Sequence, residues 1–220
     1  MKQVAVLVEG QTEEVVVNNV LCDAASSRGI CLTPVVVTTS STPTGAHRGG
    51  GHWKHYDARI RALLKASHWY RVGLLLDYYQ YPRGAPGRNT DPASHTGDSS
   101  SGRQPALIDA LRGEYPDPRF RPLVVLHEIE ALVLAAIDAG QGDGLLPRQG
   151  LTDLRQAIVS AGGPEQVNSG PGTAPSKRLE AADPRYMKTV TGPLLIAEAG
   201  LGAILARCPT FSAWWEDLLA

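Results

Sequence analysis

Four short, mainly apolar runs divide the first two thirds of the chain. They cover residues 4–8, 32–38, 72–76 and 123–126. Continuous apolar runs of this length are typical of strands that are buried on both faces of a parallel sheet. The second run carries Pro34 near its start, where a missing N–H donor is tolerated. The pattern therefore predicts four buried strands.

Between these runs, apolar residues recur at the three- and four-residue spacing of amphipathic helices. The helices expected in this part of the chain cover residues 13–26, 53–67, 104–112 and 130–138. Strand and helix thus alternate along the chain. This alternation predicts an α/β fold, in which a four-stranded parallel sheet with right-handed crossovers is flanked by helices.

The last third of the chain has a different pattern, with helices only. They are expected at residues 151–161, 191–206 and 210–219. Because these helices are few and short, we do not expect them to form an independent domain. We expect residues 1–140 to form the α/β core and residues 141–220 to form a helical extension packed on it.

Two stretches of the chain show neither the apolar runs of buried strands nor the spacing of amphipathic helices. Residues 40–51 are polar and rich in glycine, and they predict a loop after the second strand. Residues 83–102 are dominated by Gly, Pro and Ser. They predict a long mobile loop, and loops of that length in compact domains are usually functional or disordered.

Composition and charge limit the classes of function. The 220 residues carry a net charge of −1, so binding to nucleic acid would need a local basic patch. Cys22, Cys31 and Cys208 are odd in number and lack CxxC spacing, which argues against a disulfide framework or a zinc site and fits a reduced cytoplasm. We find no signal peptide and no apolar span of membrane length, and we expect a cytoplasmic protein without a membrane segment.

Three of the four expected strands end in a carboxylate. Glu9 follows the first strand, Asp77 the third and Glu128 the fourth. Glu13 opens the helix after the first strand, and Glu130 lies two residues beyond Glu128. Parallel strands end at one edge of a sheet, where crowded carboxylates repel each other unless a cation such as Mg²⁺ or Mn²⁺ lies between them. The alternative is that these acids only end strands and stabilise the first turn of a helix.

Basic residues supply candidate contacts to phosphate groups. The candidates for binding a nucleic-acid backbone are Arg48, Lys54, Arg178 and Lys188. The first two belong to a glycine-rich segment in which Trp53 offers either a stacking surface for a base or a hydrophobic staple at a helix start. The alternative for Arg178 and Lys188 is a solvated run of surface charges.

Six motifs, taken in order, carry a resemblance to a known family. They are VEGQTEE, LLLDYYQYP, LHEIEAL, APSKRL, YMK and IAEAGLGAILARCPTFSAWWEDL. Together they resemble a bacterial family that is catalogued without an assigned function, and the resemblance covers nearly the whole chain. Members of that family are similar to the Toprim fold of topoisomerases and primases, and most closely to nucleases of the overcoming-lysogenization-defect (OLD) type. The resemblance implies a metal-dependent nuclease core, often encoded near ATPases in phage-defence islands.

Carried over to this chain, the resemblance assigns roles to individual residues. Glu9 matches the Toprim glutamate, and Asp77 matches the first aspartate of the Toprim DxD motif. The chain departs from that motif at Tyr79, which stands where the second aspartate is expected. The remaining metal-ligand candidates are Glu13, Glu128 and Glu130. Lys177, in APSKRL, is the candidate for stabilising the transition state.

The expected function is hydrolysis of phosphodiester bonds in DNA or RNA with Mg²⁺ or Mn²⁺. An ATPase is an expected partner, and assembly as a homodimer is compatible with the sequence. One alternative is a non-catalytic Toprim-like module that binds a partner ATPase. Another is a phosphatase or nucleotidyl hydrolase that acts on small molecules. A P-loop is absent from the sequence, so the chain is not itself a P-loop ATPase.

Overall fold

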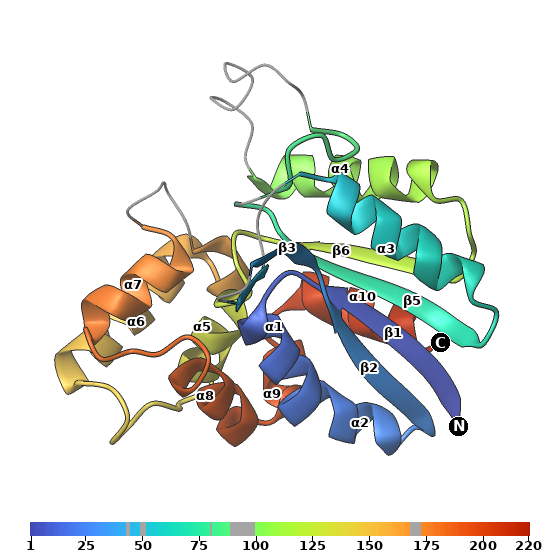
Figure 1. The fold of residues 1–220 in the computed structure, drawn as a ribbon. Helices are drawn as coiled ribbons and strands as arrows, with labels where there is room; N and C mark the ends of the chain where they lie inside the picture. The colour runs from blue at the N-terminus through green and yellow to red at the C-terminus, as the bar shows by residue number, and fades with distance from the viewer. Residues whose placement is uncertain (43–44, 49–51, 80, 89–99, 168–172) are drawn as a thin grey trace.

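A computed structural model describes residues 1–42, 45–48, 52–79, 81–88, 100–167 and 173–220. Its centre is a parallel sheet with the strand order β2–β1–β5–β6 (Figure 1). These strands are β1 (Lys2–Val8), β2 (Ile30–Val36), β5 (Trp69–Asp77) and β6 (Phe120–Val125). Each contains or overlaps one of the four expected apolar runs. The structure thus confirms the predicted four-stranded parallel α/β fold.

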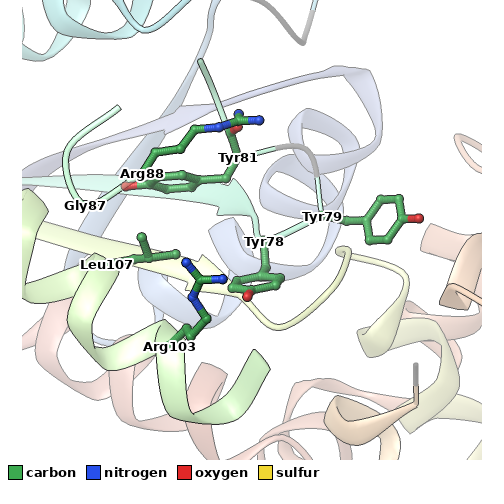
Figure 2. Close-up of a pocket in the computed structure, with 7 residues that line it drawn as sticks. All are labelled: Tyr78, Tyr79, Tyr81, Gly87, Arg88, Arg103 and Leu107. Atoms are coloured by element: carbon green, nitrogen blue, oxygen red, sulfur yellow. The ribbon is translucent and has the colours of Figure 1, made fainter. Parts of the chain in front are cut away.

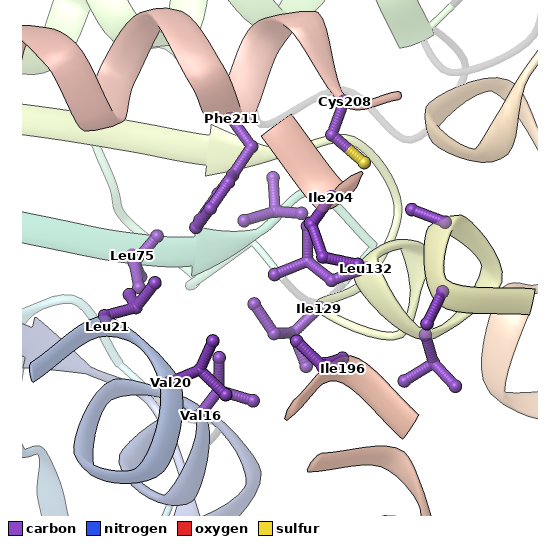
Figure 3. Packing of buried hydrophobic residues seen from close by; sticks show 14 of the residues in the cluster. Val16, Val20, Leu21, Leu75, Ile129, Leu132, Ile196, Ile204, Cys208 and Phe211 are labelled. Atoms are coloured by element: carbon purple, nitrogen blue, oxygen red, sulfur yellow. The ribbon is translucent and has the colours of Figure 1, made fainter. Parts of the chain in front are cut away.

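Residues 4–8 of β1, 72–76 of β5 and 122–125 of β6 are buried on both faces of the sheet, which explains why they are apolar without alternation. The edge strand β2 is partly exposed, and buried and exposed residues alternate at its start. On one face, Val4 and Val6 of β1 belong to a large hydrophobic cluster. On the other face, Leu7 of β1 and Leu74 of β5 belong to a second cluster. Figure 3 shows part of the first cluster, where residues from the helices at both ends of the chain pack on Leu75 of β5.

The helices that connect the strands, together with the helix that follows the last strand, cover the two faces of the sheet. They are α1 (Gln11–Val16), η1 (Val17–Leu21), α2 (Cys22–Ser26), α3 (Lys54–Lys65), α4 (Ser100–Glu114) and α5 (Ala131–Asp138). The first three follow one another without a break, and η1 is a single π-helical stretch between two α-helical ones. They pack with α5 on the first cluster, whereas α3 and α4 cover the second (Figure 1).

The segment after β2 differs from the sequence prediction. At the end of the expected second strand and in the expected loop that follows, β3 (Thr38–Thr42) and β4 (Gly45–Arg48) pair as an antiparallel ribbon. The prediction of a loop was wrong there because its Thr, Ser and Gly residues carry no alternation of apolar and polar positions that would indicate a strand. Of the expected loop at residues 83–102, residues 89–99 lie outside the described part. Helix α4 already begins at Ser100, before the predicted start.

The last third of the chain is helical, as predicted. Its elements are α6 (Arg148–Ala161), η3 (Pro164–Gln166), α7 (Pro175–Ala182), α8 (Thr191–Ala199), α9 (Leu201–Leu205) and α10 (Pro209–Leu219). One helix was expected where α8 and α9 lie, but Gly200 separates them with a φ of 77°. Helix α10 packs directly on β5, where a Cβ added at Gly73 would stand 3.1 Å from Leu218. No helix in the described ranges is both long enough and apolar enough to cross a membrane.

A buried glutamate fixes the start of α10. Glu165 in η3 accepts hydrogen bonds from the backbone N–H groups of Thr210 and Phe211, each 3.0 Å long. A carboxylate at a helix N-terminus satisfies otherwise unpaired donors and favours the helix dipole. We expect Glu165→Gln, which keeps one acceptor oxygen, to destabilise the protein by about 1–2 kcal/mol.

Thermal unfolding of Glu165→Gln and wild type measures this effect. Glu198→Gln, on the exposed surface of α8, is the control and should leave the midpoint unchanged. An equal midpoint for Glu165→Gln would contradict the capping role.

Candidate active site

The carboxyl edge of the sheet carries the predicted acids. Glu9 directly follows β1, and Asp77 is the last residue of β5. These strands are neighbours, but the chain leaves β1 on one face of the sheet through α1 and leaves β5 toward α4 on the other face. Such a reversal is the position at which open α/β sheets bind ligands. The structure therefore brings the two principal sequence candidates to the same edge of the sheet, at the ends of neighbouring strands.

The remaining acids lie on either side of this pair. Glu13 is in the first turn of α1, and its Oε2 accepts a hydrogen bond of 2.9 Å from the backbone N–H of Gly10. Glu128 and Glu130 lie in the turn that joins β6 to α5, and both are buried. That turn also contacts Asp77, whose Oδ1 accepts a hydrogen bond of 3.0 Å from the backbone N–H of Ile129.

The turn after β6 has an unusual backbone conformation. His127 has a φ of 70°, in the left-handed region that is uncommon for residues other than glycine, although histidine adopts it more often than most. Its carbonyl accepts a hydrogen bond of 3.0 Å from the N–H of Tyr79, which ties the turn to the end of β5. Strained residues of this kind cluster at functional sites, where surrounding structure holds them. Here the strain lies directly before Glu128.

Helices from the last third of the chain complete the site from the other side (Figure 1). Glu128 accepts a hydrogen bond of 2.9 Å from the backbone N–H of Ser176, in the first turn of α7. Lys188, in the turn between α7 and α8, places its ammonium 3.2 Å from a carboxylate oxygen of Glu130. The Glu130 side chain is 3% exposed, so this ion pair is shielded from solvent on one side.

The electrostatics of the group follow from burial and from like charges. Burial, reinforced by Glu13, Glu130, Glu9 and Glu128, raises the pKa of Asp77 well above its usual value. Burial also raises the pKa of Glu13 and of Glu130, although Lys188 lowers both. These carboxylates repel one another when ionised, and a proton or a cation would relieve that repulsion.

Two tyrosines are buried beside the acids. Burial raises the pKa of Tyr56 in α3, and the charges of Glu9, Glu13 and Asp77 raise it further. Burial and the charges of Glu130 and Glu128 likewise raise the pKa of Tyr186. Both remain neutral phenols at physiological pH. The sequence analysis missed them, because buried tyrosines in a helix and a turn carry no periodic signal that separates them from core residues.

The donor set suits a hard divalent ion because it consists of carboxylate oxygens, whose mutual repulsion a cation would offset. However, within the described ranges no three His, Cys, Asp or Glu side chains are grouped closely enough to hold a metal ion. The side chains of the acidic cluster, defined as Glu9, Glu13, Asp77, Glu128 and Glu130, would have to rotate toward a common point to bind one.

Unlike the acids, the basic candidates do not all lie at the same edge of the sheet. Lys177 lies on the exposed side of α7, where its ammonium is 2.7 Å from Glu180, while Lys188 stands beside the acidic cluster. Arg178 donates a hydrogen bond of 2.9 Å to the carbonyl of Thr173 and faces α6. Lys54 is exposed at the start of α3. The side chain of Arg48, at the end of β4, lies outside the described part.

Trp53 packs in the second hydrophobic cluster. It is buried, and its ring stacks on Tyr56 with centroids 5.5 Å apart and planes 6° apart. Of the two roles weighed for this residue, the structure favours packing at the start of α3 over stacking on a base.

Fold and site together define the class: a parallel four-stranded α/β protein with a buried acidic cluster at the carboxyl edge of its sheet. The chain belongs to the DUF4276 family, described as a domain of unknown function, whose model matches residues 8–219. This confirms the expected membership of a family without an assigned function.

Among solved structures, the chain is similar to the C-terminal region of the Burkholderia pseudomallei OLD protein. The two are 11% identical, the match covers 99% of this chain and 98% of the other, and the TM-score is 0.43. A TM-score of this size carries no argument about activity. A comparison with curated proteins gives no match.

Proposed function

We propose that this protein is a Toprim-like nuclease that hydrolyses phosphodiester bonds of DNA or RNA with Mg²⁺ or Mn²⁺. The observation that carries the proposal is the acidic cluster, in which acids from three neighbouring segments gather at the reversal point of the sheet. Burial and neighbouring carboxylates raise the pKa of Asp77, Glu13 and Glu130, and a bound cation would relieve the repulsion among these groups when they are ionised.

Within this proposal, Glu9 and Asp77 would hold the ion from adjacent strands, with Glu13 beside Glu9. Glu128 and Glu130 would supply the carboxylate that Tyr79 cannot. A bound divalent ion supplies polarisation of a phosphoryl oxygen and lowers the pKa of a water ligand. The chain's own contribution is to orient the acids through the N–H groups of Gly10, Ile129 and Ser176.

Lys188 is better placed than Lys177 to stabilise negative charge that develops on a phosphate. Burial tends to lower its pKa, but Glu130, Glu128 and Glu180 outweigh this and raise it, so Lys188 stays protonated. We expect Lys188→Met to lower kcat by about 100-fold, at the lower end of the range found for removal of one stabilising donor. Lys177→Met should change kcat less than about 2-fold, since its ion pair is exposed.

Steady-state cleavage by the two variants, with folding checked by circular dichroism, separates the two lysines. A large loss in Lys177→Met with normal activity in Lys188→Met would reverse this assignment and restore the role that the APSKRL motif suggests.

The direct test of the function is cleavage of mixed DNA and RNA substrates by the purified protein with Mg²⁺ or Mn²⁺, against the same reaction in EDTA. Metal-dependent cutting supports the proposal. The resemblance of the motifs further suggests an ATPase partner and a role in phage defence, so the assay is repeated with an ATPase encoded beside the gene. Absence of cutting both by the protein alone and by the protein with the ATPase would overturn the proposed nuclease function.

A second candidate function is a non-catalytic module that binds a partner ATPase. It is favoured by Tyr79 in place of the second DxD aspartate and by acids that do not converge in the described ranges. Partner binding that is unchanged by EDTA and by Asp77→Asn, without any cleavage, would support this candidate.

A further inference from the structure

A separate pocket opens next to the acidic cluster, between the end of β5 and the start of α4. Its volume is about 250 Å³, and its walls include Tyr78, Tyr81, Arg88, Arg103 and Leu107. Tyr78 directly follows Asp77, so the pocket and the acidic cluster share the same strand end. Figure 2 shows Tyr78, Tyr81 and both arginines around the opening, whereas the ring of Tyr79 points away from them.

The pocket and the acidic cluster have opposite chemical character. The seven described residues that line the pocket include three tyrosines, two arginines and no acid. Arginine side chains bind phosphate through several N–H donors and also stack on flat rings. An aromatic wall with two guanidinium groups therefore suits a ligand that is both planar and negatively charged.

Hydrogen bonds and a ring contact hold the walls of the pocket in place. The hydroxyl of Tyr81 donates a hydrogen bond of 2.8 Å to the carbonyl of Pro86, and Arg88 donates to the carbonyl of Tyr81. The side chain of Gln104 donates to the carbonyl of Val124, which anchors the beginning of α4, and with it Arg103, on β6. The ring of Tyr78 meets that of His127 edge-on at 6.4 Å. These contacts fix the positions of Tyr78, Tyr81 and the start of α4 around the pocket.

We infer that this pocket receives one unpaired base of a single-stranded nucleic acid and that Arg88 and Arg103 contact the adjoining phosphates. The volume is below the range of about 300–1,000 Å³ that is typical of drug-sized ligands, which fits one base and not a duplex. A base can enter an aromatic pocket only when it is unstacked from a duplex or already single-stranded. The inference rests on the proposed nuclease function and names the form of its substrate.

The test is the binding of a fluorescein-labelled single strand of about ten nucleotides, within the usual range of single-strand sites, measured by anisotropy in EDTA. We expect Tyr78→Leu and Arg103→Gln each to weaken binding by about 5- to 100-fold, as loss of one stacking or charged contact implies. Tyr78→Phe keeps the ring and should bind like wild type. Arg112→Gln removes the same charge farther along α4, where Arg112 is 3.5 Å from Asp217, and is the matched control.

Three further probes separate the sources of the binding energy. A duplex of the same sequence and a strand of abasic phosphodiesters should bind more weakly than the normal strand. Equal affinity for the normal strand, the duplex and the abasic strand would overturn the inference. Equal losses of affinity in Arg103→Gln and Arg112→Gln would overturn it as well. A mononucleotide that binds as tightly as the strand would also overturn it and assign the pocket to free nucleotides.

Because EDTA prevents metal-dependent chemistry, this result is independent of cleavage. If the protein cleaves normally but Tyr78→Leu and Arg103→Gln bind the strand like wild type, the inference about the pocket is wrong and the proposed nuclease function still holds. If both variants bind the strand more weakly but no metal supports cleavage, the inference about the pocket is supported and the proposed nuclease function is wrong.

Discussion

Glu9→Gln and Asp77→Asn are each expected to reduce metal-dependent cleavage by at least about 100-fold. Loss of groups that only support a metal ligand already costs about 10- to 100-fold, and these two residues are proposed as ligands themselves. Both substitutions are nearly isosteric. Asp77→Asn also keeps the oxygen that accepts the hydrogen bond from Ile129, so the fold should survive. Initial rates over a range of Mg²⁺ and Mn²⁺ concentrations measure the loss.

Matched controls lie on the exposed surface. Glu216→Gln removes a charge whose side chain is 56% exposed, and Asp143→Asn removes one that is 86% exposed. Both should cut at the wild-type rate. If Glu9→Gln and Asp77→Asn cut as well as these controls, the acidic cluster is not the site of the chemistry, and the proposed function loses the observation that carries it.

Much of the fold was predictable because burial leaves a direct mark on the sequence. Residues 4–8 of β1, 72–76 of β5 and 122–125 of β6 are covered on both faces, so they form nearly unbroken apolar runs. The edge strand β2 is partly exposed, and its run is interrupted by Thr33 and Pro34. The β3–β4 ribbon left no such mark. The break at Gly200 was missed as well, since apolar residues continue at helical spacing on both sides of the glycine.

The positions of candidate site residues could be predicted only for residues at the ends of predicted strands. Glu9 and Asp77 could be assigned to one edge because parallel strands share a direction. Lys188 could not be assigned to that edge, since it lies in an irregular turn whose position depends on how α7 and α8 pack. The pocket was also hidden, because Arg88 and Arg103 lie on opposite sides of residues 89–99 in the sequence and meet only in the fold.

The stability of the metal-free protein is expected to fall as the pH rises, because of the same acids. The pKa of Asp77, Glu13 and Glu130 is raised in the folded state, so that state binds protons more tightly than the unfolded chain. Their stabilisation is complete below the unfolded value of about 4 and is lost as the pH rises through the folded pKa. Asp77→Asn should therefore raise the metal-free Tm at about pH 8 by roughly 2–4 °C, the shift that about 1 kcal/mol produces in a protein of this size.

Metal should reverse this loss of stability where the acids are ionised. At about 100 times the Kd, a divalent ion contributes about 2.7 kcal/mol, which corresponds to roughly 5–10 °C in Tm. The effect should be much smaller at about pH 5, because protons compete for the same carboxylates. Thermal scans with EDTA, Mg²⁺ or Mn²⁺ at both pH values measure it. A metal shift that is equal at both pH values and persists in Asp77→Asn would place the bound ion elsewhere. A shift that Asp77→Asn abolishes would locate the ion at the acidic cluster, whether or not the protein cleaves nucleic acid.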